Sequence, residues 1–149
     1  MGELFAPAHL LILMIVFGIF LVPVILYILT LQKTLQKCAP ESRTIEPILI
    51  WLYLIPLVNL VVGFFIVFGI ANTLRNEFNR RGIFVADPAP GQSIGLAMCI
   101  CACCGFIPFL GVFAAIGHLV LWIMYWLKIS EYSRMLDAPA QWVAPINPL

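Results

Sequence analysis

Charged side chains are scarce in this sequence. Of its 149 residues, 10% are charged and 63% are hydrophobic, and the mean hydropathy is +1.06. Soluble domains are close to half apolar and a quarter charged, and a chain of this size cannot bury so much apolar surface in water. We therefore expect an integral membrane protein, for which lipid is the solvent of most of the chain.

An excess of charge of either sign is also missing. Eight Lys and Arg residues stand against seven Asp and Glu residues, so the sequence lacks the basic surface of a nucleic-acid-binding protein. The first eight residues contain no Lys or Arg, whereas a secretory signal needs a positive segment before its apolar core. We expect the first apolar run to be a retained membrane anchor.

Asp, Glu, Lys and Arg are absent from three long apolar runs, residues 9–31, 47–71 and 93–127. As a helix, the first run is about 35 Å long, which is enough to cross the hydrocarbon core. Pro23 is expected only to kink this helix, as membrane helices tolerate. The other two runs are interrupted at Ile55-Pro56 and Ile107-Pro108, where proline removes a helical hydrogen bond, and we expect each to form a hairpin. The sequence therefore predicts an all-α membrane protein with one transmembrane helix, two proline-broken helical hairpins and 3–5 membrane-embedded helical segments.

The two hairpins share an Ile-Pro pair at the break, Ile55-Pro56 and Ile107-Pro108. This indicates a weak internal repeat, with chance similarity between apolar helices as the alternative. Both hairpins and the first helix are predicted to form a single domain over residues 1–136. Residues 137–149 are predicted to be an extended, proline-rich tail.

Lys and Arg occur in three groups, and positive residues favour the cytoplasmic side of a membrane. If residues 47–71 dip into the membrane and return at Pro56, all three groups share that side and the N-terminus lies outside. If the run crosses once, the first two groups lie on opposite sides. The sequence favours the re-entrant hairpin with a cytoplasmic C-terminus and leaves the crossing open. The groups are Lys33, Lys37 and Arg43; Arg75, Arg80 and Arg81; and Lys128 and Arg134.

Four of the five cysteines lie between Cys99 and Cys104. Cys101 and Cys104 form a CxxC motif, but the ligands of a four-ligand metal site converge from separate turns or loops, whereas side chains on one helix point around its axis. Gly95, Cys99 and Cys103 share one helix face, and small residues at this spacing let membrane helices approach closely. We predict helix packing and no metal, with lipidation or redox chemistry as alternatives.

Few polar side chains interrupt the apolar runs. Asn59 is expected to cap the backbone freed at Pro56, with ligand binding as the alternative. His118 is a candidate haem ligand, although a hydrogen-bonded buried histidine is the commoner case. The breaks at Pro56 and Asn59 and at Pro108 and Gly111 are where a small channel or carrier would place its path. The absence of charged groups argues against ion-coupled transport, and we expect no enzymatic activity and no cofactor.

Two groups of aromatic residues stand out, one just before Pro56 and one near the end of the third apolar run. We expect them to lie in the interfacial layers of the membrane, where tryptophan and tyrosine are enriched. A stacked pigment or quinone is the alternative. These residues are Trp51, Tyr53, Trp122, Tyr125 and Trp126.

Segments 27–32, 38–43, 51–60 and 123–129 together resemble a group of small bacterial multi-pass membrane proteins of unknown function. That group carries an Ile-Pro-x-x-Asn signature, which stands here at residues 55–59. The second Ile-Pro pair lacks the Asn, because Gly111 stands in its place. The resemblance covers most of residues 20–136. It implies a bacterial cytoplasmic membrane location and no activity.

The tail combines three prolines with four exposed apolar candidates for partner contact, Trp142, Val143, Ile146 and Leu149. We expect it to dock on another subunit, since tryptophan is enriched among interface hot spots; a tail lying on the membrane surface is the alternative. The sequence therefore favours a non-enzymatic structural or accessory subunit of a larger bacterial membrane complex, an energy-converting one among the candidates. Its predicted partners are the lipid bilayer and other membrane subunits. The alternatives are a small channel or carrier, and a haem or pigment binder using His118.

Overall fold

The computed structural model describes residues 7–137, and every regular element in that part of the chain is a helix. Three helices are long and apolar enough to cross a membrane, within His9–Lys37, Leu57–Arg81 and Gly111–Asp137. The predicted all-α membrane fold is confirmed. The elements are the α-helices α1 (Pro7–Lys37), α2 (Pro56–Arg81), α3 (Gln92–Cys104) and α4 (Gly111–Asp137) and the 3₁₀ helices η2 (Pro40–Ser42) and η3 (Pro47–Leu54).

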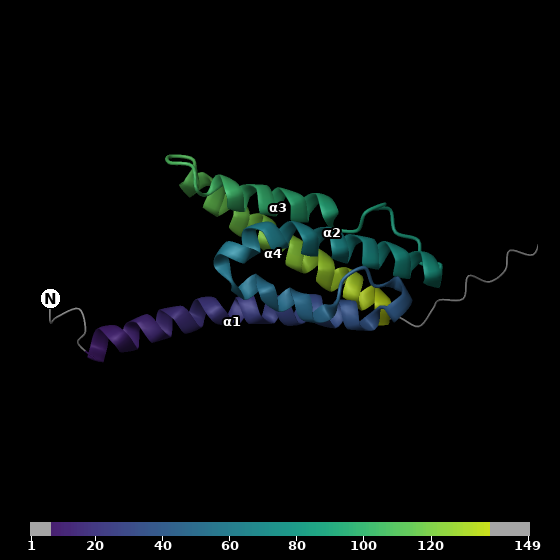
Figure 1. The fold of residues 1–149 in the computed structure, drawn as a ribbon, viewed down its shortest axis with the longest axis horizontal. Helices are drawn as coiled ribbons and strands as arrows, with labels where there is room; N and C mark the ends of the chain where they lie inside the picture. Colours follow the sequence, from purple (N-terminus) through teal and green to yellow (C-terminus); the bar gives the residue numbers. More distant parts are fainter. Residues whose placement is uncertain (1–6, 138–149) are drawn as a thin grey trace, which may run out of the picture.

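The chain runs back and forth along one long axis (Figure 1). Helices α1, α2 and α4 run towards one end of the bundle, while η3 and α3 run back from it. The element pairs η3–α2 and α3–α4 therefore form two hairpins, each with a short first arm and a long second arm. Both hairpins pack on α1. The first does so through η3 and α2, and the second through α4.

The first hairpin turns at Ile55 and Pro56. Ile55 is extended (φ −94°, ψ 107°), the conformation that a following proline imposes, and Pro56 is the first residue of α2, where its missing N–H costs no hydrogen bond. The eight residues of η3 rise about 16 Å, roughly half of the hydrocarbon thickness. Residues 47–71 thus fold back on themselves, as the re-entrant alternative predicts.

The second hairpin turns over residues 105–110, between α3 and α4. Phe109 has a left-handed backbone (φ 66°), and the Gly111 N–H donates to the Ile107 carbonyl at 2.9 Å. A Cβ at Gly111 would lie 2.7 Å from the Gly105 carbonyl oxygen, so only glycine fits where the two arms meet. The proline at 108 lies inside this turn and, unlike Pro56, precedes its helix by three residues.

The core lies in the half of the bundle that all five long elements share. Its tyrosines cluster around Tyr27, whose ring centroid lies 5.6 Å from that of Tyr53 and 6.4 Å from that of Tyr125. Trp122 and Trp126 pack on the same tyrosine. Tyr125 is buried by these contacts, so the predicted interfacial position is wrong for this residue. Trp51, Tyr53, Trp122 and Trp126 are partly exposed, and for them the interfacial belts stay a prediction; Trp51 donates to Gln32 Oε1 at 3.1 Å.

Helix α1 extends well past the turn of the first hairpin (Figure 1). The large apolar side chains of its first half are exposed by 45–75% on consecutive residues, which point in all directions around the axis. No other part of the described chain covers this half. These side chains are Leu10, Leu11, Ile12, Leu13, Met14, Ile15, Val16, Phe17, Ile19 and Val22.

Candidate functional sites at the charged end and inside the bundle

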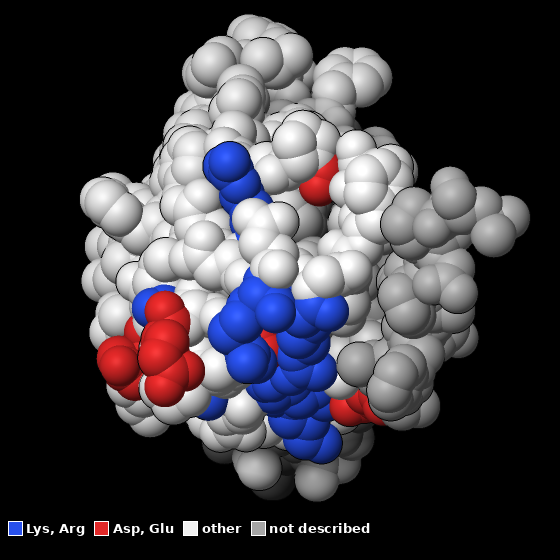
Figure 2. Space-filling view, turned by 90° about the vertical axis from the view of Figure 1, so that its right-hand side faces the viewer, with Lys and Arg blue, Asp and Glu red and all other residues white. Residues whose placement is uncertain are grey.

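The charged side chains of the described residues gather at the end of the bundle where α1, α2 and α4 finish. In a view onto this end, Lys and Arg form a band across the middle of the face, with acidic groups beside it (Figure 2). The three basic groups predicted from the sequence therefore share one end. This placement follows from the fold-back at Pro56, which returns α2 to the end that α1 has reached.

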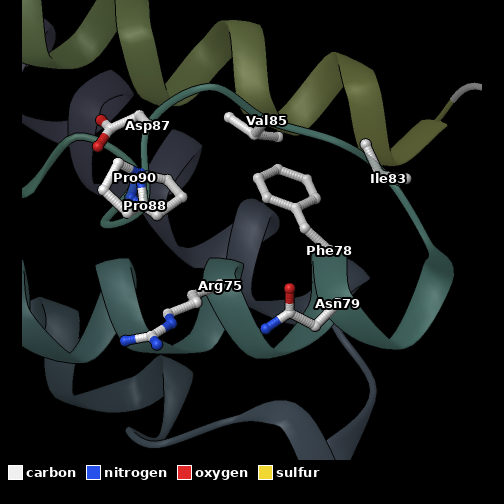
Figure 3. Close-up of a pocket in the computed structure, with 8 residues that line it drawn as sticks. All are labelled: Arg75, Phe78, Asn79, Ile83, Val85, Asp87, Pro88 and Pro90. Atoms are coloured by element: carbon white, nitrogen blue, oxygen red, sulfur yellow. The ribbon is translucent and has the colours of Figure 1, made fainter.

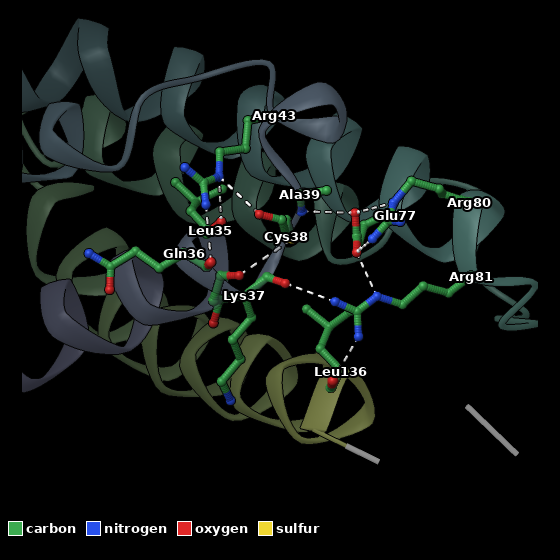
Figure 4. Close-up of polar contacts among 11 residues, drawn as sticks. Leu35, Gln36, Lys37, Cys38, Ala39, Arg43, Glu77, Arg80, Arg81 and Leu136 are labelled. Atoms are coloured by element: carbon green, nitrogen blue, oxygen red, sulfur yellow. Dashed lines mark hydrogen bonds and ion pairs between the residues drawn. The ribbon is translucent and has the colours of Figure 1, made fainter. Parts of the chain in front are cut away.

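Glu77 is the centre of the charged end. Its side chain is fully buried, and its carboxylate accepts hydrogen bonds from Arg80, from Arg81 and from the Ala39 N–H, the last at 3.1 Å (Figure 4). Removing one partner of a buried charge pair leaves the other charge without compensation, at a cost of about 3–5 kcal/mol. Glu77 therefore fixes the end of α2 against the loop that follows α1.

The guanidinium group of Arg81 extends this network to the other two long helices. Arg81 donates to the Lys37 carbonyl at 2.8 Å and to the Leu136 carbonyl at 2.9 Å. Both acceptors lie at helix C-termini, where carbonyls lack helical partners and a positive charge is favoured. One side chain of α2 thus caps α1 and α4 together. We call Glu77, Arg80 and Arg81, with the carbonyls they bind, the charged clamp.

Two further basic residues reinforce the charged clamp. Arg43 donates to the carbonyls of Leu35, Gln36 and Cys38 at 2.9–3.1 Å, and Lys37 contacts α4 through Ser133 and Asp137. All three long helices are therefore joined at this end by charge-assisted hydrogen bonds, which are stronger than neutral ones.

Cys38 lies beside the charged clamp and is buried. Burial raises the pKa of its thiol to about 11, and the nearby Glu77 adds to the rise while the arginines oppose it. A thiol in this state is protonated at neutral pH and is a poor nucleophile or metal ligand. The sequence analysis did not identify the charged clamp, although an acid with arginines three and four residues later on an apolar helix is a signal for it.

A second polar site lies between the two hairpins. Tyr53, Asn59, Cys99 and His118 line a cavity of about 20 Å³, and His118 Nδ1 lies 3.0 Å from the Met98 carbonyl oxygen. A cavity of this size admits about one water molecule. The structure thus brings together four residues that the sequence singled out separately.

The small cavity limits what His118 can hold. A porphyrin or quinone ring does not fit beside Tyr53 and Asn59 in about 20 Å³, and one ring nitrogen of His118 is already engaged with the Met98 carbonyl. The arrangement is that of a histidine hydrogen-bonded to backbone between two packed helices.

Asn59 does not cap the break at Pro56. The start of α2 has no side-chain cap, and the first helical hydrogen bond runs from the Asn59 backbone N–H to the Ile55 carbonyl at 2.8 Å. The expected capping role is wrong because Pro56 begins the helix and does not interrupt it, so no carbonyl is freed. The Asn59 side chain instead points towards Gly63 and the cavity.

Of the three small residues predicted to pack, two do so. A Cβ at Gly95 would lie 2.6 Å from Val67 Cγ1, and Cys99 is buried beside Gly63. Cys103 is exposed, and its predicted packing role is wrong, because each step of four residues turns the side chain about 40° further round the helix. Among the described residues, no group of three or more His, Cys, Asp or Glu side chains could hold a metal ion.

The two breaks do not face each other. Asn59 lies beside His118, seven residues into α4, whereas Pro108 and Gly111 lie at the far tip of the second hairpin. The predicted docking residues of the tail lie outside the described residues: Trp142, Val143, Ile146 and Leu149.

No protein-family model, no curated protein and no solved structure matches this chain.

Proposed function

We propose that the protein is a non-enzymatic accessory subunit of a larger complex in the bacterial cytoplasmic membrane, and that the first half of α1 contacts another subunit. The observation that carries the proposal is the exposed first half of α1, which has no neighbour in the described chain on any side. In the rest of the described bundle, the helices are joined by the charged clamp, and the cavity between the two hairpins holds only about 20 Å³. A rigid bundle with one free helix suits a subunit that attaches to a larger assembly.

Gly18 lies in the middle of the free half of α1. A Cβ at this position would have nothing within 4 Å, so the glycine serves no contact inside the chain. Glycine is enriched where membrane helices approach each other closely, because it lets the two backbones come together. Gly18 therefore marks the face of α1 on which a helix of another subunit would pack.

The charged end would lie on the cytoplasmic side. Seven of the eight Lys and Arg residues lie on α1, α2 and α4, which end there, and Arg43 lies in the loop that follows α1; positive residues favour the cytoplasmic side. The free half of α1 would then lie in the outer part of the membrane, with the N-terminus outside. A partner would approach this subunit from within the membrane and not from the cytoplasm.

The experiment compares two tryptophan substitutions. Gly18→Trp fills the proposed contact, and Val120→Trp is the matched control, since Val120 on α4 is also exposed, by 51%. Affinity-tagged protein is extracted in mild detergent and run on a native gel. We expect the wild type and Val120→Trp to migrate in the same large assembly, and Gly18→Trp to be released from it. A wild-type protein that migrates as a lone monomer, or an assembly that Gly18→Trp leaves intact, contradicts the proposal.

The alternatives have less support. A channel along the two breaks needs the breaks to line one path, but Pro56 and Pro108 lie in turns at different heights, and the cavity near Asn59 holds about 20 Å³. A haem-binding protein needs room beside His118 that this cavity lacks. An absorption spectrum of the purified protein tests the haem alternative independently of the native gel.

A further inference from the structure

A second, larger cavity lies at the charged end, between α2 and the loop that joins α2 to α3. Its volume is about 240 Å³. Figure 3 shows Arg75 and Asn79 on α2 along one wall, and Asp87, Pro88 and Pro90 of the loop on the other. The remaining walls are apolar and come from Phe78, Ile83 and Val85. This cavity takes no part in the charged clamp or in the proposed subunit contact.

The two charged walls carry opposite signs without neutralising each other. Among the described residues, Arg75 makes no hydrogen bond or ion pair, and it is exposed. The other basic residues of α2, Arg80 and Arg81, are both bound to Glu77. Arg75 therefore keeps its five guanidinium donors for a ligand.

Asp87 is held in place by the loop itself. Its carboxylate accepts hydrogen bonds from the Ala89 N–H at 3.1 Å and from the Gly91 N–H at 3.0 Å. Tyr132 of α4 approaches the same carboxylate at 3.5 Å. Prolines 88 and 90 have fixed φ angles, so this wall exists before any ligand arrives. Gly91 and Tyr132 both contact Oδ2, whereas Oδ1 accepts only from Ala89 and has a lone pair for a further donor.

The depth of the cavity in the membrane narrows the choice of ligand. Arg75 is the first charged residue of α2, after the 19 residues 56–74 without charge, which as a helix are about 28 Å long. Because Pro56 turns back inside the apolar part of the bundle, this length is more than enough to bring Arg75 out of the hydrocarbon, to the level of the lipid headgroups. Cavities with basic groups at this level bind lipid headgroups in other membrane proteins.

We propose that this cavity binds the headgroup of an aminophospholipid, with its phosphate on Arg75 and Asn79 and its primary ammonium on Asp87. A ligand with only a negative charge would be repelled by Asp87, and one with only a positive charge by Arg75. A zwitterion with a phosphate and an ammonium satisfies both walls, and Phe78, Ile83 and Val85 suit the apolar part next to the headgroup. The volume is below the roughly 300–1,000 Å³ of pockets for drug-sized ligands and fits a small headgroup.

The experiment measures lipid retention by native mass spectrometry. Purified protein in a neutral detergent receives an equimolar mixture of phosphatidylethanolamine, phosphatidylglycerol and phosphatidylcholine with identical acyl chains. We expect the wild type to retain one phosphatidylethanolamine in preference to the others. Arg75→Gln should lower this retention at least fivefold. Lys33→Gln, which removes an exposed positive charge from α1 at the same end, should retain as much as the wild type.

Asp87→Asn tests the contribution of the acidic wall separately from that of the basic wall. It should abolish the preference for phosphatidylethanolamine over phosphatidylglycerol, because the ammonium loses its partner. Since Asp87 also holds the loop, Arg75→Gln carries the test if Asp87→Asn fails to fold. Retention that is equal for the three lipids, or that Lys33→Gln lowers as much as Arg75→Gln, overturns the proposal.

A final arm distinguishes a lipid from a soluble ligand of the same chemistry. Free phosphoethanolamine at millimolar concentration should not displace the retained lipid, because it lacks the apolar part that contacts the cavity walls and the surrounding chains. Complete displacement would mean that the cavity recognises a soluble phosphate ester and not a lipid, and would overturn the assignment to phosphatidylethanolamine.

Discussion

At one end of the bundle, a buried carboxylate and two arginines join the ends of three helices; at the other, the turns of the hairpins and the first half of α1 separate from one another. The charged end is held by directional bonds to Glu77 and to helix carbonyls. Apart from the exposed His9, the uncharged end presents mainly apolar side chains, which another membrane segment can cover. The comparison indicates that the shape of the molecule is fixed from the charged end, and that the uncharged end is where it can adapt to a neighbour.

The largest effect is expected from removing the centre of the charged clamp. Glu77→Ala leaves Arg81 without its buried partner, and we expect the free energy of unfolding to fall by about 3–5 kcal/mol. Unfolding of the purified protein in mixed micelles of increasing denaturing-detergent content measures it. Glu131→Ala is the control, since Glu131 pairs with Lys128 on the exposed surface and such pairs contribute little. Equal losses in the two variants would mean that the charged end is not held as described.

A smaller effect is expected where α3 meets α2 in the middle of the bundle. Gly95→Leu would force Val67 and Tyr125 apart, because even a Cβ at this position comes within 2.6 Å and 2.9 Å of their side chains. Overpacking of this kind costs about 1–3 kcal/mol. Gly18→Leu on the free half of α1 should leave the stability of the isolated protein unchanged. The same micelle titration tests both, and a loss in Gly18→Leu as large as in Gly95→Leu would show that the first half of α1 is packed.

The smallest effect is expected from chemical modification, the alkylation of the cysteines. The exposed Cys103 near the uncharged end should react with a small membrane-permeant maleimide while Cys38 at the charged end does not. Burial protects Cys38 and raises its pKa to about 11, so raising the pH from 7 to 9 should leave it largely a neutral thiol. Mass spectrometry of peptides from the labelled protein locates the modified residues. Labelling of Cys38 at pH 7 as fast as that of Cys103 would contradict the buried position.

The sequence was sufficient to locate the breaks, whereas α1 runs to Lys37, six residues past the apolar run 9–31 that predicted it. The Ile-Pro pairs are strong local signals. Gly82, just after Arg80 and Arg81, is another, and it ends α2 with a left-handed backbone (φ 68°). The fold-back at Pro56 was anticipated because it brings all positive residues to one end. These features depend on neighbouring residues or on a summed charge, both of which can be read along the chain.

The sites depend on contacts between distant residues, and there the sequence was a poorer guide. Glu77 looks like a solvated residue among Asn79, Arg80 and Arg81, and its burial follows only when the loop at Ala39 lies against it. Tyr125 was assigned to the membrane interface because position along an apolar run does not reveal which way a side chain faces. The cavity of Arg75 and Asp87 requires the loop to fold over α2, which no local pattern predicts.

The placement of every described charge at one end also affects how the chain enters a membrane. Both turns at the opposite end, at residues 55–56 and 105–110, contain no charged side chain. Moving a charged side chain to the membrane centre costs about 2.5–3.5 kcal/mol on insertion scales. Each hairpin can therefore insert as a unit from the side on which the charged end lies, short arm and long arm together, without carrying any charge through the hydrocarbon.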